Sequence, residues 1–147
     1  MPSKQDISNA EVFLKFASFP TIYYIYCSET KGINKYKFLV FFPSEKEDEV
    51  LFLMINSKKY FYGDSGEIKI MANEMPCLQR DSFLDCRECF VISKEELIFR
   101  IASNINNYDK GVFPKALYPR VVEAVSKSVT IEKRYKRMIL FSLKSNK

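Results

Sequence analysis

The chain has 147 residues, of which 47% are hydrophobic and 28% charged, and its formal net charge is +5. This length fits one domain over residues 1–147, and the hydrophobic content excludes a disordered chain. No apolar run reaches the roughly 18 residues that a membrane span needs, and the first residues lack the pattern of a signal peptide, so we expect a cytoplasmic protein with no membrane partner.

The first two-thirds of the chain predict one helix followed by short strands. Capping-box spacing at Ser8 and Glu11 predicts a helix over residues 9–17. Aromatic, β-branched and apolar runs predict strands over residues 21–27, 37–42, 50–55, 58–61, 67–71 and 82–92. A charged turn between 37–42 and 50–55 predicts that these two strands form a hairpin. The strand-rich part, residues 21–92, therefore predicts a small bent antiparallel barrel in an α+β protein.

Residues 93–145 are predicted to be helical. A second capping box at Ser93 and Glu96 opens a helix that continues to Ile105, Pro114 and Pro119 open a further turn or helix, and Thr130 can cap the last one. Residues 1–108 carry a net charge of −2, whereas residues 109–147 carry +7. The basic C-terminal helices are either a solvated surface or a surface that attracts polyanions.

The composition excludes several kinds of active site. The chain has no histidine and only four glycines, which excludes Ser-His-Asp and Cys-His catalysis and Gly-rich phosphate loops. Cys86 and Cys89 are predicted to point to opposite faces of a strand, so they cannot share a metal ion, and we expect reduced cysteines, no metal and no cofactor. The remaining chemistry includes RNA cleavage by its own 2′-hydroxyl, which needs a base, cations and a proton donor.

Polar or charged residues stand at the ends of three predicted strands. The order of these three segments along the chain resembles that of a known family. The segments are Lys37-Phe-Leu-Val-Phe, Met54-Ile-Asn-Ser57 and Ser82-Phe-Leu-Asp-Cys-Arg87, with a tail from Lys110-Gly-Val-Phe to Val125. This order resembles the MazF/PemK family of messenger-RNA-cleaving toxins. The resemblance implies an SH3-like barrel followed by C-terminal helices, metal-independent cleavage of single-stranded RNA, a homodimer and an antitoxin protein as partner. The helix predicted over residues 9–17 is an extra element that the family pattern lacks.

The resemblance also implies roles for individual residues. Lys37 and Arg87 would stabilise the phosphate, and Asp85 would be the general base. Asn56 and Ser57 would position the RNA backbone. Independently of the resemblance, Tyr60 and Tyr62 lie near a polar turn and are the best candidates for base stacking. The sequence departs from the family pattern, since Lys37 replaces an arginine, Asn56 replaces a threonine, and Asp85 and Arg87 stand in swapped order.

Plainer interpretations of the same residues stay open. Asp85 and Arg87 can be a surface ion pair, and Lys37 and Ser57 can be a solvated strand end. Most aromatic residues, including Phe38 and Phe41, are expected in the core. The alternative function is a non-catalytic barrel module that binds a protein or nucleic acid through its basic C-terminal helices. A structural protein without a nucleic-acid role is the third reading.

Overall fold

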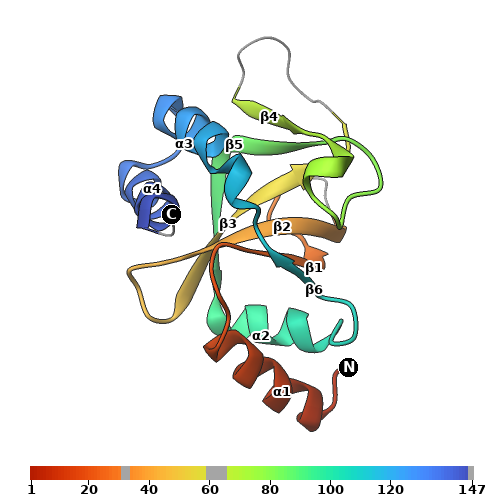
Figure 1. Ribbon diagram of the computed structural model, residues 1–147. Helices are drawn as coiled ribbons and strands as arrows, with labels where there is room; N and C mark the ends of the chain where they lie inside the picture. The colour runs from red at the N-terminus through yellow and green to blue at the C-terminus, as the bar shows by residue number, and fades with distance from the viewer. Residues whose placement is uncertain (31–33, 59–65, 146–147) are drawn as a thin grey trace.

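The computed structural model describes residues 1–30, 34–58 and 66–145. These ranges contain helices and strands from both ends of the chain (Figure 1). In chain order they are α1 (Lys4–Lys15), β1 (Thr21–Cys27), β2 (Lys35–Pro43), β3 (Glu49–Asn56), β4 (Glu67–Ile70), the 3-10 helix η1 (Ala72–Glu74), β5 (Ser82–Ser93), α2 (Lys94–Ala102), β6 (Asp109–Val112), the 3-10 helix η2 (Lys115–Leu117), α3 (Tyr118–Lys127) and α4 (Lys133–Ser145). The α+β class is therefore confirmed.

The six strands form an antiparallel sheet in the order β4-β5-β3-β2-β1-β6. The sheet twists and curls into a half-barrel (Figure 1). The predicted hairpin between residues 37–42 and 50–55 is confirmed, because β2 pairs with β3 from Leu39 opposite Met54 to Pro43 opposite Val50. The predicted strand over residues 58–61 falls largely outside the described residues, and β4 pairs with β5.

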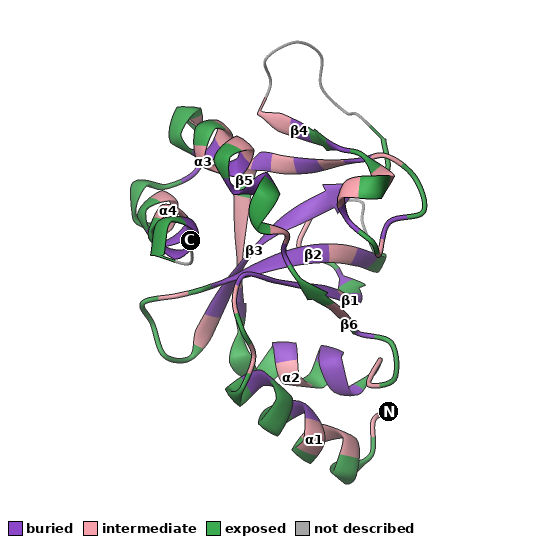
Figure 2. Ribbon diagram, in the orientation of Figure 1, coloured by how far each residue is buried: buried purple, intermediate pink, exposed green. Residues whose placement is uncertain are grey.

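Both faces of this sheet are buried, so the protein has two hydrophobic cores. Successive residues of a strand point to opposite faces, and the neighbours Phe41 and Phe42 are both 0% exposed yet belong to different clusters. Figure 2 shows the central strands β2 and β3 buried along most of their length. Burial on both faces explains why these two segments are apolar runs rather than alternating patterns.

Each face is covered by its own pair of helices. On what we call the α4 face, Val121 of α3 and Ile139 of α4 pack in the cluster that contains Phe42. On the α1 face, Leu14 of α1 and Leu97 of α2 pack in the cluster that contains Phe41. The two helix pairs therefore lie on opposite sides of the sheet (Figure 1).

The α1 face contains a buried polar tie between α2 and the end of β1. Arg100, which is 9% exposed, donates two hydrogen bonds of 2.7 Å to the carboxylate of Glu29 and one of 3.1 Å to the carbonyl of Tyr26. Its Nε also lies 3.0 Å from the carboxylate of Glu96. Burial opposes ionisation of Glu29, but the bonds from Arg100 outweigh it and hold the pKa of Glu29 below its usual value.

The start of the first helix differs from the prediction. Ser3, not Ser8, is the N-cap, because its Oγ accepts from the N–H of Asp6 at 3.0 Å and its own N–H donates to the Asp6 carboxylate. The Ser8–Glu11 spacing lies inside the helix, which extends upstream so that Ile7 also packs on the α1 face. By contrast, Ser93 caps α2 as predicted, accepting from the N–H of Glu96 at 3.1 Å.

Two features of the C-terminal part were not predicted. The segment expected to be helical contains a strand, β6, which pairs with β1 at one end of the sheet. The backbone N–H of Gly111 in this strand donates to the carboxylate of Asp109 at 2.9 Å. Thr130 does not cap the last helix, because its hydroxyl donates to the carbonyl of Arg87 and α4 begins at Lys133.

A bulge in β5 overturns the prediction for its cysteines. Phe90 and Asp85 pair with Phe52 and Met54, so four residues of β5 stand opposite one residue of β3. The bulge breaks the strand alternation, and both Cys86 and Cys89 pack against the cluster of the α4 face. Burial raises the pKa of Cys89 to about 12, which makes its thiol inert at neutral pH.

None of the helices among the described residues is long and apolar enough to cross a bilayer.

Candidate functional site

Lys37 and Asn56 are cross-strand neighbours on the α1 face. The pairing of Leu39 with Met54 places them opposite each other two residues further along, and the Nζ of Lys37 donates to Oδ1 of Asn56. Lys37 is only 8% exposed, and burial lowers the pKa of its ammonium group, with Lys35 adding to the effect. Lys37 is therefore not the solvated strand end of the plainer interpretation.

Asp85 and Arg87 interact with each other at the start of the β5 bulge. The Asp85 carboxylate accepts the backbone N–H of Arg87 at 2.9 Å and lies 3.5 Å from its Nε. Asp85 pairs with Met54 on β3 and with Glu67 on β4. It is close enough to Lys37 for its negative charge to raise the pKa of that lysine, against the larger effect of burial.

The structure brings some predicted site residues together and separates others. Lys37, Asn56 and Asp85 lie toward one end of the α1 face. Arg87 contacts Asp85 but borders a different hollow, beside α3, together with Arg120 and Thr130. Tyr60 and Tyr62 lie outside the described residues.

Ser57 belongs to a third place, a hollow of about 580 Å³ on the α4 face that we call the basic hollow. Its described lining contains four basic residues and no acidic residue. The basic residues are Lys35, Lys37, Arg80 and Lys110, and the polar residues include Ser57, Gln79, Ser82 and Asn107. Lys35 and Lys37 border the hollow from positions of β2 whose side chains belong to the α1 face, where Lys37 bonds to Asn56, so Arg80 and Lys110 are the main cations of the hollow. A lining with this charge attracts anions.

Three aromatic rings form a ladder along one wall of the basic hollow. The ring of Tyr24 lies 4.8 Å from that of Phe38 and 5.7 Å from that of Tyr36 between centroids. The Nζ of Lys110 lies 5.9 Å from the centroid of the Tyr24 ring. Tyr36 is 40% exposed, so part of the ladder is open to a planar ligand.

The sequence analysis missed this ladder. Phe38, expected in the core, is half-buried and borders the hollow. The available signal was the alternation of Tyr24 and Tyr26, and of Tyr36 and Phe38, in two strands that pair with each other. Aromatic residues at every second position lie on one face of a sheet, which predicts a ladder once the pairing is known.

The chemistry of the basic hollow favours binding over catalysis. Cys77 borders it, but burial raises the pKa of its thiol, so it is not an activated nucleophile. Within residues 1–30, 34–58 and 66–145, no three side chains of His, Cys, Asp or Glu lie close enough to hold a metal ion.

No protein-family model matches the sequence, and no curated protein shows significant similarity to it.

Proposed function

We propose that this protein binds single-stranded RNA in the basic hollow. The observation that carries the proposal is the combination of Arg80 and Lys110, no acidic residue and a partly exposed aromatic ladder in one described lining. Arg80 and Lys110 would contact phosphates, and Tyr36 would stack on a base. A single strand fits better than a duplex, because stacking on a side chain needs a base that is not already stacked in a helix.

The proposal has a finer part, which is membership in the MazF/PemK-like group with an SH3-like barrel and metal-independent RNA cleavage. The contact of Lys37 with Asn56, with Asp85 nearby on the same face, supports it. Asp85 would take the proton of the 2′-hydroxyl, whose oxygen bonds to the adjacent phosphorus as the bond from phosphorus to the 5′-oxygen breaks. This leaves a 2′,3′-cyclic phosphate, and the released 5′-oxygen takes a proton from solvent. Lys37 and Arg87 would stabilise the charged intermediate.

Binding and cleavage are separate claims, since Ser57 borders the basic hollow and Arg87 borders the hollow beside α3. In the toxin setting the protein would form a homodimer and bind an antitoxin protein. If RNA binds but stays intact, the alternative of a non-catalytic binding module takes precedence. That alternative places the binding surface on the basic C-terminal helices. The RNA would instead bind in the basic hollow.

The binding claim is tested by fluorescence anisotropy with a labelled single-stranded RNA at low and high salt. Combining Tyr36→Ala with Lys110→Ala should weaken binding at least about tenfold, because a stacked base and a phosphate contact are lost together. Phe16→Ala combined with Lys46→Ala is the matched control, since both residues are exposed and lie outside the hollow. Equal affinities for the two double variants would refute the binding site.

The cleavage claim is tested with purified protein and RNA in the presence of a chelator. Wild type should produce fragments with 2′,3′-cyclic phosphate ends, and Arg87→Ala and Asp85→Asn should slow their formation by about a hundredfold or more. Identical products at identical rates from wild type and both variants would remove the nuclease assignment and leave RNA binding in place.

A further inference from the structure

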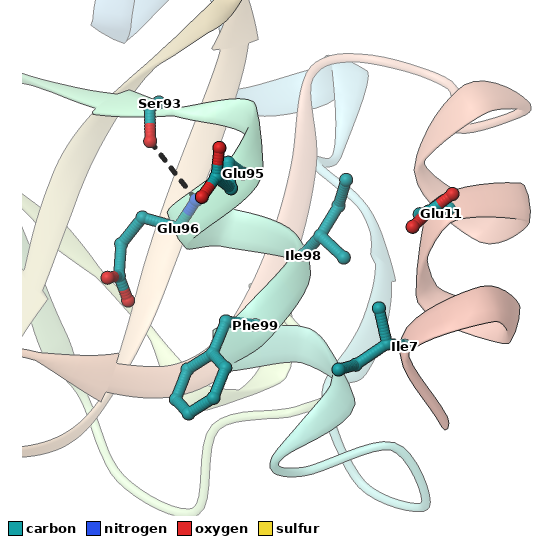
Figure 3. A pocket seen from close by; sticks show the side chains of 7 residues that line it. All are labelled: Ile7, Glu11, Ser93, Glu95, Glu96, Ile98 and Phe99. Carbon is teal, nitrogen blue, oxygen red and sulfur yellow. Dashed lines mark hydrogen bonds between the residues drawn. The ribbon is translucent and has the colours of Figure 1, made fainter. Parts of the chain in front are cut away.

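A groove lined by residues of α1 and α2 combines acidic and apolar side chains, and Glu96 and Phe99 point to the side of α2 away from α1 (Figure 3). It has a volume of about 590 Å³, and its described lining contains no lysine or arginine. The acidic residues are Glu11, Glu95 and Glu96, and the apolar ones are Ile7, Ile98 and Phe99. We call this the acidic groove.

The charge and the apolar surface of the acidic groove are both available to a partner. Glu96 pairs with Arg100, but Glu11 and Glu95 form no ion pair with any residue that the structure describes. Figure 3 shows Ile7 and Ile98 facing each other between the two helices. Phe99 is 41% exposed. A fitting partner would therefore present basic residues around an apolar side chain.

Helix α4 of this chain has that surface. Its residues 133–145 include five basic residues and no acidic one. Arg134, Arg137, Phe141 and Lys144 are exposed at spacings of three and four residues, which places them in one stripe along the helix. Arg134 and Arg137 form exposed ion pairs with Glu132 and Glu45, which docking would have to exchange for pairs with the acidic groove. The side chain at the centre of the stripe, Phe141, is 72% exposed.

We propose that α4 of one molecule docks in the acidic groove of a second copy, with Phe141 against Phe99. The contact must be intermolecular, because α4 packs on one face of the sheet and α1 and α2 pack on the other. A contact between two different surfaces of the same chain is head-to-tail, so it extends into open chains unless the rotation closes a ring. The basic hollow takes no part in it, so this inference is independent of RNA binding.

The first experiment is sedimentation velocity of the full chain over a range of concentrations at low and high salt. The average mass should rise with concentration at low salt, and high salt should weaken the association because the rim charges are screened. Phe141→Ser should weaken it at least about tenfold, as expected for an anchor at the centre of an interface. A wild type that stays monomeric throughout would overturn the proposal.

The second experiment separates head-to-tail association from a symmetric dimer. One variant combines Glu11→Gln with Glu95→Gln, and the other combines Arg137→Gln with Phe141→Ser. Each alone should stay monomeric, but an equimolar mixture should form a 1:1 pair, because each supplies the surface that the other has lost. Glu47→Gln combined with Glu88→Gln is the charge-matched control and should associate like wild type. Association of either variant alone, or failure of the mixture to pair, would show that these surfaces do not meet.

Discussion

The two faces of the sheet use the same strands but differ in the helices that cover them. Helices α3 and α4 carry seven basic and one acidic residue, whereas α1 and α2 carry four of each. The α4 face also holds the basic hollow, and the α1 face borders the acidic groove. The difference shows how a charge imbalance along the sequence becomes a charge imbalance in space, because the fold places the C-terminal helices on one side only.

The largest effect is expected when one large side chain is removed from the core on each face of the sheet. Phe41→Ala and Phe42→Ala should each lower the free energy of unfolding by about 4 kcal/mol, because both rings are fully buried and each truncation leaves a cavity. Chemical denaturation measures both. A loss below about 1 kcal/mol for one variant alone would mean that its face does not form a packed core.

A smaller effect is expected from the polar tie of the α1 face. Arg100→Met should cost about 3 kcal/mol, because it leaves the Glu29 carboxylate partly buried without its partner. Arg120→Met is the matched control, since the Arg120–Glu74 pair is more exposed (42% and 32%) than the Arg100–Glu29 pair (9% and 20%) and its loss should cost less. Equal losses would show that the tie is no stronger than a surface ion pair.

The next test compares two glycines near the two edges of the sheet. Gly66 and Gly111 have φ angles of +90° and +91°, which side chains disfavour, so alanine should cost about 1–2 kcal/mol at either. At Gly66 the new Cβ would also lie 2.6 Å from Cγ of Arg87, whereas at Gly111 it meets nothing within 4 Å. Gly66→Ala should therefore be the more destabilising in thermal melts, and the reverse order would place Arg87 elsewhere.

The smallest expected effect is a dependence of stability on pH. The folded-state pKa of Glu29 is lower than its ordinary value of 4.5, so its contribution is complete above that pH and is lost as the pH falls below it. Denaturation at pH 6 and pH 3.5 should show a larger acid-induced loss for wild type than for Arg100→Met. Parallel pH profiles for the two proteins would contradict this linkage.

Local sequence patterns predicted most strands but not the features that depend on pairing. The segment over residues 21–27 is a strand as predicted, because its β-branched and aromatic residues suit a sheet in any context. The four residues of β6 have no such pattern, and they are a strand because they pair with β1. The helix start at Ser3 was missed because two segments share capping-box spacing and only packing selects one.

The sequence singled out some residues of the candidate site but could not place them relative to one another, because their arrangement also depends on strand pairing. Strand-end position was enough to single out Lys37, Asn56 and Asp85, which lie on one face. The separation of Arg87 from Ser57 depends on the bulge in β5, which no local pattern shows. The aromatic ladder required the register between β1 and β2, which is also a long-range property.

The short strand β6 has a consequence for how the protein behaves when concentrated. A strand at the border of a sheet normally offers its free amides to strands of other molecules, which is a route to fibrils. Here the exposed residue Asp109 places a negative charge on this border strand, and its carboxylate accepts the amide of Gly111, so an incoming strand meets a charged side chain. Replacing Asp109 by a neutral, β-forming residue should therefore allow β6 to pair with strands of other molecules and promote cross-β aggregation.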